Sequence, residues 1–247
     1  MKPVDCHCHL DFDQFKDDRE EVINRAKEKL EFIVSVGCDP ERNNTTLEIA
    51  GSNEDFIEFN LGLHPTSTDY FDEVEKVKSQ IRDNDPVAVG EIGLDHHHIT
   101  GEDVRERQEE VFRELLELAE ELGKPVNVHS RDAEQKTIEI LKEYDLPDIL
   151  IHCFNGSPKQ AREAVENGMT IGVTTQVLYS DEVQDIVREL EVNDIILETD
   201  SPFLYRGERN EPVNVCESAE KIAELKETSK DEVIDTTTGN AQRIFGQ

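Results

Sequence analysis

The sequence has no long apolar run and no glycine-rich phosphate-binding loop. No apolar stretch approaches the roughly 20 residues that a membrane-spanning helix needs, and the first residues do not show the basic and apolar segments of a signal peptide. Neither a GxGxxG nor a GxxxxGK[ST] pattern follows a candidate strand, which argues against a dinucleotide-binding or P-loop protein. We therefore expect no membrane span and no nucleotide cofactor held by such a loop.

Cysteine is also scarce. The 247 residues include five cysteines, an odd number without the spacing of a disulfide framework. Reduced thiols in a cytoplasmic protein are the simplest interpretation.

Basic residues are few. The chain has 26 Lys and Arg against 57 Asp and Glu, a net charge of −31. This balance argues against a broad electrostatic footprint on duplex DNA, because phosphate binding relies on Lys and Arg. It does not exclude a metal site that accepts one phosphate at a time. Two interpretations of the charge stay open: a solvated acidic surface, or adaptation to molar salt, where the Debye length is about 3 Å.

Short apolar runs alternate with charged segments of helical periodicity along the whole chain. Eight strand–helix units predict a single domain over residues 1–247 with a (β/α)₈ TIM-barrel fold rather than an open doubly wound sheet. The expected strands are 4–8, 32–36, 56–61, 87–91, 126–129, 149–153, 169–173 and 195–198.

Helix boundaries are marked by capping residues. Gly123 follows an amphipathic segment at 102–122 and predicts its end. Ser157 before Pro158 predicts a helix start, and Ser229 with a glutamate three residues later is typical of a capping box. The apolar stripe expected on the helix at 102–122 consists of Val104, Val111, Leu115, Leu118, Ala119 and Leu122.

Metal-binding side chains gather where the expected strands end. In a TIM barrel the carboxyl ends of the strands carry the functional site, and six of the eight strands end in His, Glu or Asp. One strand-end histidine has ordinary explanations, but this repetition is hard to explain as chance. The strand-end residues are His7, His9, Cys38, His64, Glu91, His129, His152, Thr174 and Asp200.

Imidazoles and carboxylates bind Zn²⁺, Mn²⁺ and similar ions, and one carboxylate can bridge two ions. Because side chains alternate along a strand, His7 and His9 share a face, while Cys6 and Cys8 point to the other and pack as small apolar residues. The same alternation places Cys153 on the face opposite its neighbouring histidine. A cysteine-rich zinc knuckle is therefore not expected.

Seven motifs, in order, resemble the TatD family of metal-dependent deoxyribonucleases within the amidohydrolase superfamily. The resemblance runs from residue 5 to "NAQRIF" at 240–245 and implies a somewhat distorted TIM barrel. The motifs are "DCHCHLD" (5–11), "GLHP" (62–65), "GEIGLD" (90–95), "VHSR" (128–131), "HCFNGS" (152–157), "ETDSP" (198–202) and "RGERNEP" (206–212).

The resemblance implies two divalent metal ions, Zn²⁺, Mn²⁺ or Mg²⁺, with Glu91 as the bridging ligand. It implies that Asp200 also accepts a proton from the attacking water, and that His64 contacts the scissile group. Arg131 and Arg209 are candidate phosphate contacts, and for both an ordinary ion pair is an equally good interpretation. The implied ligands are His7, His9, Glu91 and Asp200 for one ion, and Glu91, His129 and His152 for the other.

The chain departs from the family pattern at two places. Residues 96–98 read "HHH" where relatives usually have an aromatic residue. These histidines could bind adventitious metal, but we expect a flexible, solvated loop, and the departure puts base stacking there in doubt. Glu208 stands where relatives often carry a basic residue, which weakens the case for tight DNA binding at this edge.

The sequence thus predicts a cytoplasmic metal-dependent hydrolase, most consistent with a deoxyribonuclease that trims single-stranded DNA ends by means of water activated at two metal ions. Two alternatives stay open: hydrolysis of a small ester, lactone or amide at the same metal site, and metal binding without turnover. DNA is the expected partner, no membrane is expected, and a monomer is favoured.

Overall fold

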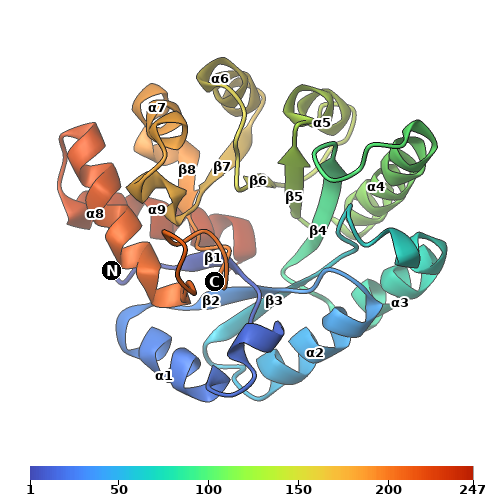
Figure 1. Cartoon of the computed structure of the whole chain (residues 1–247), viewed down its shortest axis with the longest axis horizontal. Coiled ribbons are helices and arrows are strands. Elements are labelled where there is room, and N and C mark those ends of the chain that lie inside the picture. Colours follow the sequence, from blue (N-terminus) through green and yellow to red (C-terminus); the bar gives the residue numbers. More distant parts are fainter. Residues whose placement is uncertain (247) are drawn as a thin grey trace.

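The computed structural model describes residues 1–246 and shows eight parallel strands in one sheet, each hydrogen-bonded to the next in chain order (Figure 1). This order is that of a TIM barrel, as the alternation of strands and helices predicts. The strands are β1 (Asp5–Cys8), β2 (Ile33–Val36), β3 (Ile57–Leu61), β4 (Ala88–Asp95), β5 (Val126–Arg131), β6 (Ile149–His152), β7 (Met169–Val173) and β8 (Ile195–Leu197).

Helices follow the strands and form the outer layer of the barrel (Figure 1). None of the helices within residues 1–246 is both long enough and apolar enough to cross a bilayer. The helices are α1 (Arg19–Lys29), α2 (Pro40–Gly51), α3 (Val74–Asn84), α4 (Glu102–Leu122), α5 (Glu134–Leu141), α6 (Pro158–Glu166), α7 (Asp181–Glu189), α8 (Val215–Lys226) and α9 (Lys230–Phe245).

The barrel closes just beyond the end of β8. Cys8 and Ser201 form a parallel bridge, and the His9 N–H donates to the Ser201 carbonyl at 2.8 Å. The register shifts between β1 and β2 and again between β4 and β5. These irregularities are the distortion that the family resemblance implies.

Most of the expected helix ends are confirmed. Gly123 ends α4 with a left-handed φ of 62°, and the Ser157 side chain caps α6 in a complete capping box. At α9 only half of the expected box forms: the Ser229 hydroxyl accepts from the Glu232 N–H, but the Glu232 carboxylate accepts from Thr228 instead. The expected stripe on α4 is buried except at its two ends, Val104 and Leu122.

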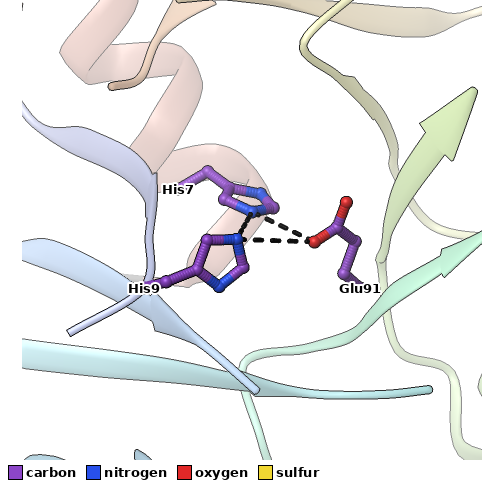
Figure 2. A group of neighbouring side chains, drawn as sticks. All are labelled: His7, His9 and Glu91. Atoms are coloured by element: carbon purple, nitrogen blue, oxygen red, sulfur yellow. Dashed lines mark hydrogen bonds and ion pairs between the residues drawn. The ribbon is translucent and has the colours of Figure 1, made fainter. Parts of the chain in front are cut away.

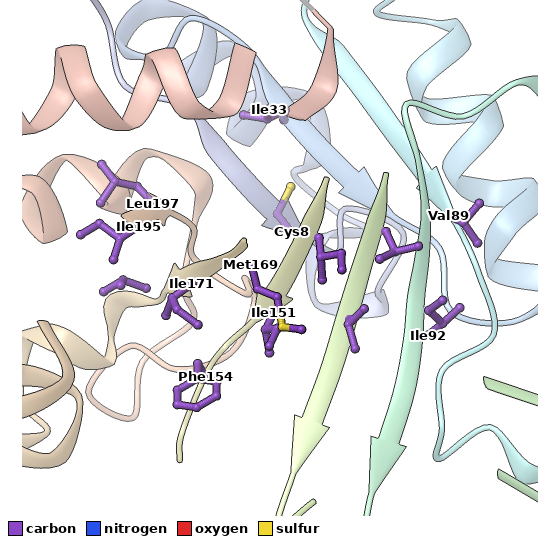
Figure 3. Close-up of a cluster of buried hydrophobic side chains, with 14 of the residues drawn as sticks. Cys8, Ile33, Val89, Ile92, Ile151, Phe154, Met169, Ile171, Ile195 and Leu197 are labelled. Carbon is purple, nitrogen blue, oxygen red and sulfur yellow. The ribbon is translucent and has the colours of Figure 1, made fainter. Parts of the chain in front are cut away.

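Cys6 and Cys8 are packed as predicted. Both are buried free thiols, and Cys8 lies in the main apolar cluster with residues such as Ile33 and Ile195 (Figure 3). Cys6 belongs to a second cluster that includes Ile244 of α9. Burial of this kind raises the pKa of both thiols and keeps them uncharged.

Strand β4 runs four residues past its expected end at Glu91 and reaches Asp95. Gly93 permits this extension, because its φ of 142° is rare for other residues and a Cβ there would lie 2.0 Å from the carbonyl oxygen of His129. The close approach of β4 to β5 brings Asp95 level with Arg131 in the sheet register. A second acidic side chain of β4 therefore reaches the mouth of the barrel.

Candidate metal centre

A cavity of about 890 Å³ opens at the carboxyl ends of the strands. Its lining includes seven of the nine strand-end residues expected from the sequence, and His7 lies fully buried against two of them, His9 and Glu91. Thr174 is buried and caps a short helix instead. The seven that line the cavity are His9, Cys38, His64, Glu91, His129, His152 and Asp200.

One oxygen of the Glu91 carboxylate faces the two histidines of the first motif. Glu91 Oε2 lies 3.4 Å from His7 Nε2 and 3.7 Å from His9 Nε2. The two Nε2 atoms are 3.2 Å apart, and the second carboxylate oxygen turns away from them (Figure 2). These three side chains offer converging donor atoms at one point.

The other oxygen of Glu91 faces three further histidines. Glu91 Oε1 lies 3.0 Å from His129 Nδ1, 3.3 Å from His64 Nε2 and 3.9 Å from His152 Nε2. Because β4 lies between β3 and β5, it presents this oxygen to side chains from both neighbouring strand ends and from β6. Glu91 thus stands between His7 and His9 at one oxygen and His64 and His129 at the other. The His152 ring stacks on the His7 ring, with centroids 3.5 Å apart, and so lies between the two groups.

Asp200 completes the first group from a backbone position with a left-handed φ of 55°. Its N–H donates to the His7 carbonyl at 2.9 Å, which fixes the turn that follows β8. The carboxylate oxygen Oδ1 lies 3.3 Å from His9 Nε2 and 3.8 Å from His152 Nε2. Asp200 therefore faces the same point as His7 and His9 from the opposite side.

The outer ring nitrogens of the buried histidines face polar groups of the protein. His9 Nδ1 bonds to the Val36 carbonyl at 3.0 Å, and the Asn127 amide lies against His7 Nδ1. His129 Nε2 bonds to Asp95 Oδ2 at 3.1 Å, whereas His152 Nδ1 lies 3.0 Å from Glu198 Oε1 without forming a hydrogen bond. With a polar group at each outer nitrogen, the inner nitrogens point to the site, which is how metal-ligating histidines are held.

The carboxylates and imidazoles of this cluster shift one another's pKa values. Burial raises the pKa of Glu91, but His64, His7 and His129 outweigh it and hold that pKa well below 4.5. Burial likewise disfavours the protonated His129, yet hydrogen bonds to Asp95 and Glu91 raise its pKa to about 9. The carboxylates of Glu91 and Asp200, whose pKa values are both lowered, lie among these imidazoles. Ionised carboxylates and imidazoles suit Zn²⁺ or Mn²⁺, so the residues present fit a metal centre.

His64 differs from the other histidines of the site in that its Nδ1 accepts a backbone hydrogen bond. Its Nδ1 accepts from the Thr66 N–H at 3.1 Å and lies 2.7 Å from the Thr66 hydroxyl. An accepting Nδ1 leaves the ring proton on Nε2, which points to Glu91. In this arrangement His64 is set up as a hydrogen-bond donor toward Glu91, and its Nε2 also lies in a group with Glu91 and His129 that could hold an ion.

The prediction that Cys153 lies on the face opposite His152 is wrong. Strand β6 ends at His152, and Cys153 has a φ of 45°, which breaks the alternation and turns its side chain to line the cavity. Burial and the neighbouring Asp200 and Glu198 raise the pKa of the Cys153 thiol well above 9. The Cys153 sulfur nevertheless lies with donor atoms of His152 and Asp200 in a group that could hold an ion.

Comparison with known proteins identifies the family. Residues 4–246 match the family model described as "TatD related DNase". The chain belongs to this family. An uncharacterized metal-dependent hydrolase of Methanocaldococcus jannaschii is 38% identical over 250 residues, 99% of this chain and 97% of that protein. The human deoxyribonuclease TATDN3 is 35% identical over 260 residues, 98% of this chain and 94% of that protein.

The fold of this TatD-related chain also matches solved structures. A TatD homologue from Escherichia coli K12 superposes with a TM-score of 0.90 at 30% identity, over 99% of this chain and 98% of that one. The barrel and its family are thus shown by independent comparisons of sequence and of structure.

The two arginines singled out in the TatD-like motifs have different surroundings. Arg131, at the end of β5, lines the cavity, and its guanidinium has no hydrogen-bond or ion-pair partner within residues 1–246. Arg209 is 2.6 Å from Asp18 and 2.9 Å from Glu211 and is not among the cavity-lining residues. The ion-pair interpretation therefore describes Arg209, whereas Arg131 stays available to a ligand.

Three buried residues that hold the TatD-like histidines were not expected from the sequence. They are Asp95, Asn127 and Glu198, which contact His129, His7 and His152 respectively. Asp95 and Glu198 stand inside the quoted motifs "GEIGLD" and "ETDSP", so their acidic character at a strand end was a usable signal. The Glu198 carboxylate has room beside β7 because residue 172 is glycine. A Cβ at Gly172 would lie 2.5 Å from Glu198 Oε1.

Two of the three histidines in the "HHH" segment contact carboxylates. His98 Nδ1 is 2.8 Å from Asp95 Oδ2, and the His98 N–H donates to the same carboxylate at 2.7 Å. His97 pairs with Asp132 at 3.0 Å. Both side chains remain about half exposed, so the segment is solvated as expected but held in place by two carboxylates.

Proposed function

We propose that this protein is a metal-dependent hydrolase that uses two divalent ions to cleave phosphodiester bonds at the ends of single-stranded DNA. The observation that carries the proposal is the position of Glu91, with one carboxylate oxygen facing His7 and His9 and the other facing His129. A carboxylate placed in this way suits a bridge between two ions. The deoxyribonuclease activity named for the human relative supports the choice of substrate.

The proposed ligand sets follow the geometry on each side of Glu91. His7, His9 and Asp200 would share one ion with Glu91, and His129 and His152 would share the other. When bound, such ions act as Lewis acids that offset negative charge at a phosphoryl centre. The outer hydrogen bonds of the imidazoles orient the rings, so little reorganisation is needed on binding.

Asp200 is the proposed general base. Burial raises its pKa, but His9, His152 and His7 outweigh this effect and hold the pKa below 3.8, so the carboxylate is ionised at neutral pH. Its side chain lines the cavity and remains slightly exposed. It can therefore accept a proton from a water molecule that approaches a substrate in the cavity.

His64 and Arg131 are the proposed contacts to the substrate phosphate. The ring proton on His64 Nε2 points into the site, where it can donate to a phosphate oxygen or to the departing oxygen. The guanidinium of Arg131 can pair with phosphate in two parallel hydrogen bonds. Because these are few contacts in a chain of net charge −31, a free single strand suits the site better than a long duplex.

The test is digestion of end-labelled linear single-stranded DNA and of closed circular single-stranded DNA of the same sequence, with a panel of small esters in parallel. Purified protein is stripped with a chelator and reloaded with Zn²⁺, Mn²⁺ or Mg²⁺, and Glu91→Ala purified identically serves as the control for contaminating nucleases. We expect metal-dependent release of mononucleotides from linear DNA only.

Each other outcome changes the assignment. Circles cut as fast as linear strands would replace the exonuclease with an endonuclease. Cleavage of esters without cleavage of DNA would move the substrate to small molecules. Metal binding without any turnover would leave a binding protein.

A further inference from the structure

Two phenylalanines stand at the mouth of the cavity and have no part in the metal centre. Phe12 and Phe203 both line the cavity, and their ring centroids are 5.3 Å apart with an interplanar angle of 88°. Phe203 is 39% exposed, and it is one of five large apolar side chains within residues 1–246 that are at least 36% exposed. An aromatic ring exposed at the rim of this cavity offers a large apolar surface to a ligand inside it.

Phe12 is fixed by its other neighbours. The guanidinium of Arg42 lies 3.9 Å from the centre of the Phe12 ring, and the His9 ring lies 5.1 Å from it. Arg42 is itself bound to Asp11 at 2.8 Å, so its charge is already matched. Phe12 is therefore a rigid support, and Phe203, in edge-to-face contact with it, has ring surface left for a further group.

The phenylalanine pair and the available arginine lie on different sides of the barrel. Phe12 follows β1 and Phe203 follows β8, which are joined where the barrel closes. Arg131 ends β5, four strands away from β1 in the sheet order and so across the barrel from it (Figure 1). Glu91 and its histidines lie between the two sides.

We propose that Phe203, supported by Phe12, is a stacking platform for a nucleobase of the strand whose phosphate occupies the metal centre. This inference rests on the proposed function. Stacking on an aromatic ring tolerates every base, because each base has a π-face, and it needs no cation. It therefore supplies affinity for DNA that a chain of net charge −31 does not obtain from basic residues.

The first experiment measures binding without turnover. Calorimetry compares thymidine 5′-monophosphate with 2-deoxyribose 5-phosphate, which lacks the base, on metal-loaded protein. We expect the nucleotide to bind roughly 5- to 150-fold more tightly, the range of one base–aromatic stack. Phe203→Ala should remove this difference and leave binding of the sugar phosphate unchanged, whereas Phe203→Tyr should keep the difference.

The matched control is Tyr179→Ala, because Tyr179 is a comparably exposed aromatic at 45% that is not among the cavity-lining residues. It should preserve the preference for the nucleotide. Equal binding of the two ligands by the unaltered protein would overturn the proposal. So would a Phe203→Ala variant that loses affinity for both ligands equally, since that result indicates a structural role.

The second experiment separates this proposal from the proposed function. Linear oligonucleotides with a normal or an abasic terminal residue are digested by the same variants, and Phe203→Ala should raise KM only for the normal one. If no DNA is cut but the nucleotide preference depends on Phe203, the stacking site stands and the nuclease assignment fails. If DNA is cut with no difference between normal and abasic ends, the stacking site fails and the nuclease stands.

Discussion

Replacement of Asp95 by asparagine tests whether the two sides of Glu91 are separate metal sites. Asp95 is buried, 3.1 Å from His129 Nε2 and 2.8 Å from His98 Nδ1, and contacts none of the histidines around Glu91 Oε2. Asparagine has nearly the same shape and keeps one oxygen that can accept the His129 proton, but its NH2 group replaces the oxygen that accepts the His98 N–H. The substitution therefore removes the charge at Asp95 together with one bond to the exposed His98, and leaves the histidines around Glu91 Oε2 untouched.

The expected effect follows from the hydrogen bond that changes. A hydrogen bond to a charged group contributes up to about 3 kcal/mol, and a neutral one about half of that. Asp95→Asn should therefore cost about 1.5 kcal/mol in the binding of the ion that His129 holds, which is about a tenfold loss of affinity. This agrees with the 10- to 100-fold losses typical of residues that orient a metal-ligating histidine.

The assay is competition of the reloaded protein with a chromophoric chelator, which gives a dissociation constant for each bound ion. One constant should rise about tenfold and the other should not change. Asp132→Asn is the matched control, because Asp132 makes the same kind of contact to His97, at 3.0 Å, on the surface. Equal weakening of both ions, or no weakening of either, would refute the assignment of His129 to a site of its own.

Three further results are expected. Glu91→Ala should lose both ions, because each of its oxygens faces a different group of histidines; retention of two ions by metal analysis would contradict the bridge. In the protein stripped of metal by a chelator, the pKa of His129 is about 9, against 6.5 for an ordinary histidine. Protonated His129 therefore stabilises the fold fully below pH 6.5, and this stabilisation is lost as the pH rises through 9. The melting temperature should fall over that window, and a rise would contradict the pairing of His129. If the charge of −31 reflects a saline cell, melting temperature should increase through a KCl series to molar concentration, and a flat series would exclude that interpretation.

The strand positions could be predicted because each strand is a short apolar run bounded by charged or turn residues. Six strands begin and end within one residue of the expected bounds. A seventh, β5, extends two residues past its expected end, to Arg131. The histidines at the strand ends could be predicted for the same reason, since barrel geometry brings strand ends together whatever the side chains between them. Local pattern and topology were sufficient for these features.

The parts that could not be predicted depend on contacts between distant residues. The extension of β4 depends on Gly93 passing close to the His129 carbonyl, which no run of apolar residues indicates. The turn of Cys153 into the cavity depends on a left-handed φ that the sequence does not mark with glycine or asparagine. For Arg209 the sequence left a phosphate contact and an ion pair equally open, and only the fold brings Asp18, far away in the sequence, to 2.6 Å from it.

The surroundings of the arginines also bear on the proposed nuclease activity of so acidic a protein. Of the two arginines that line the cavity within residues 1–246, Arg42 is matched by Asp11 and supports Phe12, so only Arg131 is available to a phosphate. Attraction of the substrate must then come mainly from the metal ions and from aromatic surface, neither of which needs basic residues. A few localised contacts of this kind give a shallow dependence of binding on salt, because few counterions leave the DNA when it binds. The acidic exterior and the proposed phosphate-binding site are therefore compatible, since the expected attraction is confined to the cavity that Glu91 and its histidines line.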